Sequence, residues 1–203
     1  MNKPTHADIE RLIRKIILPF YHVKRDRPLP IGERRPENDA EHSWSVAFLA
    51  CALAPQIDPK LDVGKIAQYA TAHDLVEVYA NDTSVFASAE DLASKAAREE
   101  LALKQITKEF AHFPWIIRTI EEYEHKDSNE AKFVYALDKY IAVTYDYIDE
   151  GKMFRDRKVS ISQYDKSLEA HRQKAQSHTE VGKYYNEVRD LLDSHPEFFH
   201  INE

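Results

Sequence analysis

The stretch Ala70–Glu77 reads ATAHDLVE and lies where apolar residues recur at helical spacing. It places a histidine directly before an aspartate, with a glutamate three residues after the aspartate, in an otherwise apolar segment. Burial of such polar side chains costs free energy unless other groups pair with them. We therefore expect other segments of the chain to supply partners for His73, Asp74 and Glu77.

The composition of the 203 residues predicts an all-α protein. Hydrophobic residues make up 43% and charged residues 31% of the chain, as in globular domains. The chain has only four glycines, which favours helices over the many tight turns of a β-sandwich or barrel. We expect a single domain over residues 1–203, a bundle of about seven to nine helices. Its core is expected within about residues 5–151, followed by a C-terminal helical extension at 160–195.

The charge and the cysteine content exclude several classes of protein. A net charge of −7 argues against a nucleic acid polymer as partner. The single cysteine, Cys51, allows neither a disulfide framework nor a zinc site made of cysteines. The N-terminus has no apolar signal core, and no apolar run reaches the length of a membrane span. We expect a cytoplasmic protein that does not bind membranes.

Capping residues and apolar periodicity predict the order of the helices. The expected helices cover residues 5 to about 19, 38–54, 61–80, 88–111, 113–123, 128–150, 162–178 and 179–193. Between the first two lies a basic segment, Phe20–Asp39, that contains three prolines and a glycine and is expected to be a loop. Loops of this length are uncommon in compact domains and are often functional.

Two further polar residues interrupt the apolar faces of other expected helices. His42 lies one turn before the apolar stripe of the second helix, and Asp138 lies within the stripe of the sixth. With His73 and Asp74 they form a set of two imidazoles and two carboxylates that can enclose one divalent cation. Mixed nitrogen and oxygen ligands suit Mn²⁺, Fe²⁺, Co²⁺ or Zn²⁺ better than Ca²⁺. A six-coordinate ion would keep two positions for a water and a substrate oxygen.

Each of these residues also has an ordinary structural interpretation. His42 could cap its helix, and Asp82 could be a turn residue. Asp138 could pair with a lysine of its own helix, and Glu77 with Lys65 on a solvated face. Taken together, these alternatives explain poorly why several polar residues lie on apolar helix faces.

Four motifs, in this order and spacing, resemble the HD-domain metal-dependent phosphohydrolases. They are most similar to the 5′-deoxynucleotidase group of that superfamily, over about residues 11–151. The motifs are Glu37–Ser43 (ENDAEHS), His73–Glu77 (HDLVE) with Asn81–Asp82, Glu122–Ala131 (EYEHKDSNEA) and Leu137–Lys139 (LDK). The family commonly has glycine where this chain has Asn81, and asparagine tolerates the same left-handed backbone angles. Relatives also have an Arg-Trp pair in the early loop, where here Arg27 precedes a proline.

The resemblance implies a role for each part of the site. The metal ligands would be His42, His73, Asp74 and Asp138, with Mn²⁺, Co²⁺, Zn²⁺ or Fe²⁺ as the cation. Glu77 and Asp82 would be the acid/base pair beside the attacking water. The substrate-binding residues would be Arg27, Arg35 and Glu124. The resemblance also suggests a homodimer, with the aromatic segments Tyr140–Tyr147 or Tyr184–Tyr185 as candidate interfaces.

The expected reaction is hydrolysis of (deoxy)nucleoside 5′-monophosphates to nucleoside and phosphate. A phosphomonoester dianion repels hydroxide, so its hydrolysis needs a cation on the phosphate and a positioned water. An acid must also protonate the leaving 5′-oxygen. A dNTP triphosphohydrolase with the same metal site is the enzymatic alternative. The second alternative is a non-catalytic HD scaffold that binds a nucleotide or a protein.

Overall fold

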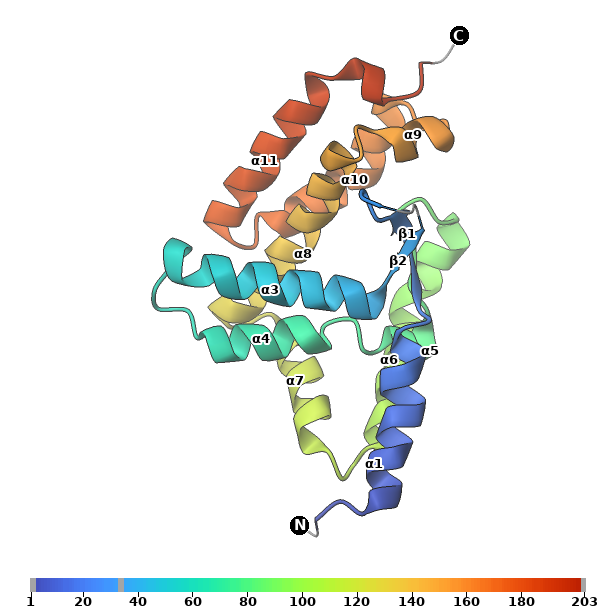
Figure 1. Cartoon of the computed structure of the whole chain (residues 1–203), viewed down its shortest axis with the longest axis vertical. Helices are drawn as coiled ribbons and strands as arrows, with labels where there is room; N and C mark the ends of the chain where they lie inside the picture. The colour runs from blue at the N-terminus through green and yellow to red at the C-terminus, as the bar shows by residue number, and fades with distance from the viewer. Residues whose placement is uncertain (1–2, 33–34, 202–203) are drawn as a thin grey trace.

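The computed structural model describes residues 3–32 and 35–201. Within them the protein is all-α apart from one two-stranded sheet (Figure 1). In that part of the chain eight helices have seven or more residues, as the composition and periodicity predicted. None of the helices described has the length and apolar character needed to cross a bilayer.

The elements follow one another in a simple order. The first part comprises α1 (His6–Leu12), η1 (Ile13–Ile17), α2 (Leu18–Phe20), β1 (Lys24–Pro28), β2 (Pro36–Asn38), α3 (Asp39–Ile57), α4 (Val63–Ala72) and α5 (Glu77–Ala80). The second part comprises α6 (Ala89–Glu109), α7 (Pro114–His125), α8 (Asn129–Ile148), α9 (Lys152–Asp156), α10 (Ile161–Ala175), α11 (Thr179–Asp193) and η2 (Pro196–Phe198).

Side-chain caps begin most of the long helices where the sequence predicted them. Thr5 and Asp8 form a capping box at α1, and Asn38 forms one with Glu41 at α3. Ser128 accepts a hydrogen bond from the backbone of Ala131 and so caps α8. These local contacts explain why the helix starts could be predicted from the sequence alone.

The expected loop at residues 20–39 contains a short antiparallel hairpin instead. Strands β1 and β2 pair with Lys24 opposite Asn38 and Pro28 opposite Pro36. The strands show no alternation of apolar and polar residues, so no periodic pattern in the sequence predicts them. The hairpin leads directly into α3 and brings the basic side chains of β1 toward the interior, since Arg25 and Arg27 are both largely buried.

The third expected helix is broken in the structure. Helix α4 ends at Ala72, the next four residues form turns, and α5 begins at Glu77. The ring nitrogen Nδ1 of His73 hydrogen-bonds to the carbonyl oxygen of Ala70 at 2.8 Å, which secures the end of α4. His73 and Glu77 therefore do not share one continuous helix, contrary to the sequence-based expectation.

Within residues 3–32 and 35–201, three apolar clusters hold the helices together. The first joins α3, α4, α7 and α8 around side chains such as Val46, Ile66 and Leu137. The second joins the N-terminal helices to α5, α6 and α7, and the third packs α10 and α11 on α8. Since α8 contributes to both the first and the third cluster, the C-terminal helices lie beside the helix that carries Asp138 (Figure 1).

Candidate metal centre and its cavity

Three buried ligand groups from three helical segments converge near the start of α3. They are His42 on α3, His73 directly after α4, and Asp138 on α8, and their nearest ligand atoms all lie within 4.8 Å of one another. Atom Nε2 of His42 lies 3.0 Å from Oδ1 of Asp138, and Nε2 of His73 lies 3.1 Å from Oδ2 of Asp74. The four residues that the resemblance assigned to a metal are thus brought together.

The hydrogen bonds of the two imidazoles fit a metal site. The Nδ1 atom of His73 faces the Ala70 carbonyl and donates to it, which leaves Nε2 as the ring nitrogen available to a metal. Atom Nε2 is buried and lies 3.1 Å from Oδ2 of Asp74, and it makes no hydrogen bond of good geometry with any residue that the structure describes. His42 likewise has Nδ1 at 3.3 Å from the carboxylate of Glu37. Metal-binding histidines usually donate their other N–H to a carbonyl or carboxylate in this way.

The two aspartates are held in their ionised form. Burial acts to raise the pKa of Asp74, but His73 and Arg25 lower it well below its usual range. Burial likewise opposes ionisation of Asp138, but Lys139 and His42 hold its pKa well below the usual value. Because metal ligands must be deprotonated, both carboxylates are ready to bind a cation.

Two cationic side chains contact these carboxylates. Nη1 of Arg25 donates to Oδ2 of Asp74 at 2.8 Å and lies 3.4 Å from Asp39. Nζ of Lys139 lies 2.5 Å from Oδ2 of Asp138, so the ion pair considered for Asp138 does form, beside its contact with His42. No motif in the sequence singles out Arg25. Its only signal was membership of the basic segment before α3.

Glu77 and Asp82 lie in the same cavity, of about 270 Å³, as Asp74 and Asp138. Oε1 of Glu77 is 3.4 Å from Lys95 on α6, and Oε2 is buried and has no hydrogen bond to any of the described residues. Burial, with the charges of Asp74 and Asp82, raises the pKa of Glu77 well above its ordinary value. The partner of Glu77 is thus Lys95 rather than Lys65. Before Asp82, Asn81 has a positive φ of 60°, which fits its place in a turn.

The three expected substrate-binding residues lie in different places. Arg27 lines the cavity, but its Nε and Nη2 are both 2.7 Å from the buried carboxylate of Asp146. Arg35 pairs with Glu41 at the surface and does not line the cavity. Glu124 also lies outside the cavity lining and pairs with Lys126 at 3.2 Å.

One wall of the cavity comes from residues that no sequence motif indicated. Helix α10 contributes Ser167, Ala170, His171 and Lys174 to its lining. These residues lie in the C-terminal extension, outside the region that carried the family motifs. Only the packing of α10 against α8 brings them to the centre.

The motifs, the convergence of their side chains and the helical fold all agree with one family. Residues 21–180 match the sequence profile of the HD domain. The chain belongs to the HD-domain family. The match covers most of the chain and includes all the residues brought together at the centre.

Individual proteins that resemble this HD-domain protein have names that describe phosphohydrolases. It is 33% identical over 110 residues to the human 5′-deoxynucleotidase HDDC2, and 32% identical over 109 residues to the mouse protein. Each alignment covers 52% of this chain and about half the length of the relative. Among solved structures, the chain resembles a predicted metal-dependent phosphohydrolase of Magnetospirillum magnetotacticum MS-1. That likeness has a TM-score of 0.77 at 25% identity and covers 96% of this chain and 95% of the other.

Proposed function

We propose that this HD-domain protein is a metal-dependent phosphohydrolase that converts (deoxy)nucleoside 5′-monophosphates to nucleoside and phosphate. The observation that carries the proposal is the buried cluster of His42, His73 and Asp138, beside a cavity that also holds Glu77 and Asp82. The similarity to two 5′-deoxynucleotidases supports the choice of substrate class.

The proposed metal ligands are His42, His73, Asp74 and Asp138. Their nitrogen and oxygen donors suit Mn²⁺, Co²⁺, Zn²⁺ or Fe²⁺. When bound, such a cation would withdraw charge from a phosphate oxygen and make water a better nucleophile at neutral pH. The buried, unpartnered Nε2 of His73 is the feature of this chain that fits a metal best.

Glu77 and Asp82 are the proposed proton-transfer groups. The raised pKa of Glu77, caused by burial and by Asp74 and Asp82, makes its protonated form more available than that of an ordinary glutamate. Such a carboxyl can protonate the leaving 5′-oxygen of the nucleoside. Asp82 lines the same cavity and is the proposed acceptor of a proton from the attacking water. Two carboxyl groups in different environments commonly divide acid and base roles in this way.

Arginines of the hairpin have two proposed roles. Arg25 would orient Asp74 through the 2.8 Å contact between Nη1 and Oδ2. Arg27 remains our candidate for a substrate contact, because it lines the cavity. Arg35 and Glu124 are not assigned to substrate binding, because neither lines the cavity.

The size of the cavity favours a mononucleotide. Its volume of about 270 Å³ lies just below the range of about 300–1,000 Å³ that is usual for small-molecule sites. A nucleoside triphosphate carries two more phosphoryl groups and would need a longer site.

Product analysis tests the proposed reaction. Metal-free protein is supplied separately with Mn²⁺, Co²⁺, Zn²⁺ or Mg²⁺ and incubated with dAMP and with dATP. We expect inorganic phosphate and deoxyadenosine from dAMP. Tripolyphosphate from dATP, with dAMP untouched, would instead identify a triphosphohydrolase. Bound metal without turnover of mono-, tri- or cyclic nucleotides would identify a binding scaffold.

We also propose a homodimer, and the surface of α3 and α8 offers an interface. Trp44 and Phe48 stack with their ring centroids 5.5 Å apart and are 67% and 66% exposed. Together with Tyr140 and Tyr145 they line one shallow surface pocket. Exposed apolar patches often mark protein interfaces. Light scattering of the full chain measures the oligomeric state, and a monomer at micromolar concentration would reject this proposal.

A further inference from the structure

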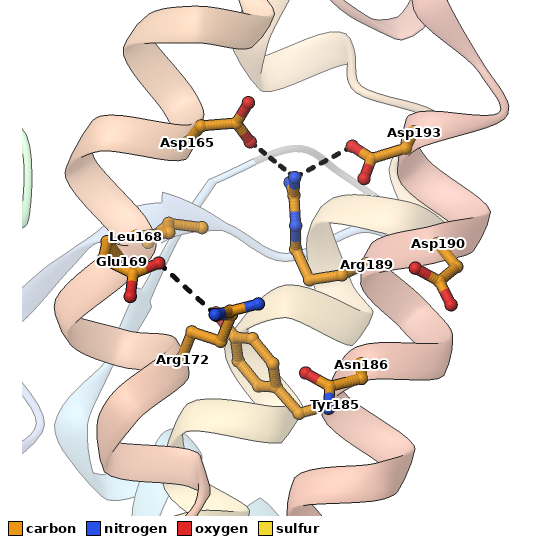
Figure 2. A pocket seen from close by; sticks show the side chains of 9 residues that line it. All are labelled: Asp165, Leu168, Glu169, Arg172, Tyr185, Asn186, Arg189, Asp190 and Asp193. Carbon is orange, nitrogen blue, oxygen red and sulfur yellow. Dashed lines mark hydrogen bonds and ion pairs between the residues drawn. The ribbon is translucent and has the colours of Figure 1, made fainter.

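Helix α10 presents two different faces to the rest of the protein. Four residues at positions i, i+3, i+4 and i+7 line the metal-centre cavity: Ser167, Ala170, His171 and Lys174. This spacing places them on one side of the helix. The side turned to α11 carries a different set: Asp165, Leu168, Glu169 and Arg172 (Figure 2).

Packing fixes the rotation of α10 about its own axis. Tyr164, Leu168 and Ala175 are buried in the third apolar cluster. On α11, Arg189 lies over the ring of Tyr164, 4.8 Å from its centroid, and reaches Asp165 at 2.5 Å. Figure 2 shows the Arg189 guanidinium between Asp165 and an acid of its own helix. The cavity-facing side of α10 is therefore set by contacts on its opposite side.

Lys174 differs from the other lysines of the cavity wall. Lys95 pairs with Glu77, and Lys139 pairs with Asp138. The side chain of Lys174 makes no hydrogen bond or ion pair with any residue in the described part of the chain, and Lys174 is exposed where it lines the cavity. Partial burial and the positive charges of Lys139 and Lys95 lower its pKa. An ammonium group placed among like charges is stabilised by an anion between them.

His171, one turn before Lys174, adds no charge of its own near neutral pH. Burial, with the charges of Lys139 and Arg27, lowers its pKa to about 2. A neutral imidazole can donate one hydrogen bond and accept another. The cavity wall formed by α10 thus combines one unpaired cation with one neutral polar group.

We propose that Lys174 binds the phosphate group of the substrate, so that the C-terminal extension completes the site formed by α3, α4 and α8. The inference rests on the proposed function in one respect, that the ligand is a phosphate monoester. It adds a binding residue outside the family motifs and gives α10 a role in substrate affinity. A lysine serves phosphate as a flexible point charge and needs no fixed geometry.

Binding of inorganic phosphate to the metal-loaded full chain tests the proposal by calorimetry. Lys174→Gln should weaken phosphate binding about tenfold, since a charge-assisted hydrogen bond contributes about 1.5 kcal/mol. The KM for dAMP should rise by a similar factor, with kcat changed less than about threefold. The matched control is Arg172→Gln, which removes one positive charge from the other face of the same helix. It should leave both constants within about twofold of wild type.

The outcomes separate this inference from the proposed function. Unchanged phosphate affinity in Lys174→Gln, or an equal loss in Arg172→Gln, overturns the role of Lys174 even if dAMP is hydrolysed. A wild-type protein that binds phosphate through Lys174 but hydrolyses no nucleotide would overturn the proposed function and retain the inference. If the metal-loaded wild-type protein does not bind phosphate, the proposal that Lys174 binds the phosphate group is overturned. Thermal unfolding of each variant excludes misfolding as the cause.

Discussion

Two groups of charged side chains lie on opposite sides of α10. One surrounds His42, His73 and Asp138, and the other lies between α10 and α11 (Figure 2). The cavity-facing and α11-facing residues of α10 are offset by two positions, which is about 200° around a helix. One helix therefore separates two polar clusters with very different environments.

The two clusters differ in burial and in how their charges are paired. At the α10–α11 pocket, exposed acids such as Asp165 and Asp193 pair with Arg189, and Glu169 pairs with Arg172. Exposed pairs of this kind contribute little to stability. At the metal centre the groups are buried, and Nε2 of His73 lies 3.1 Å from Oδ2 of Asp74. A bound cation would offset the cost of bringing these buried groups together.

The largest effect is expected from Asp74→Ala at the metal centre. We expect loss of bound metal and a fall in activity of at least about 10³-fold, because the cation contributes several kcal/mol to the reaction. Metal content by elemental analysis and kcat/KM for dAMP measure the two effects. Helix content by circular dichroism should stay near wild type. If the Asp74→Ala variant kept its metal and its activity, the cluster around His42, His73 and Asp138 would not be a catalytic metal centre.

A somewhat smaller effect is expected from Glu77→Gln. This change keeps the size of the side chain but removes its acidic proton, so kcat should fall by about 10²–10³-fold. Bound metal should remain, because Glu77 is not among the proposed ligands. Steady-state kinetics and metal analysis of the same preparation check both points. A kcat within about threefold of wild type would reject Glu77 as a proton-transfer group.

Arg27→Met tests the ion pair that Arg27, in the cavity wall, makes with Asp146. It leaves the buried carboxylate of Asp146 without its bidentate partner, so unfolding free energy should fall by about 3 kcal/mol. Urea denaturation measures this change. The double variant Arg27→Met/Asp146→Leu should recover most of the stability. If the KM of the double variant for dAMP is higher than that of the wild type, Arg27 also contacts substrate. A KM equal to that of the wild type would limit Arg27 to a structural role.

The smallest effect is expected in the α10–α11 cluster. Asp165 is 51% exposed, and Asp165→Asn should change the unfolding free energy by less than about 1 kcal/mol. Activity on dAMP should stay within about twofold of wild type. The same denaturation and kinetic assays apply. A loss of activity comparable with that of Asp74→Ala would mean that this second cluster is itself part of the catalytic site.

Much of the candidate site could be predicted because its residues stand in ordered motifs on amphipathic helices. His42 and Asp138 interrupt apolar stripes, and a polar group on an apolar face is visible without a structure. Arg25 could not be selected among its basic neighbours, because all of them precede α3 in a segment without periodicity. Only the hairpin register shows which arginine reaches Asp74.

The sequence by itself determined the all-α fold, most helix starts and the residues able to ligate a metal. These features depend on local capping, on helical periodicity and on side-chain chemistry. Tertiary structure alone decided the pairing of Arg27 with Asp146 and the place of Lys174 in the cavity wall. Each of these depends on contacts between residues far apart in the chain, which no local pattern encodes.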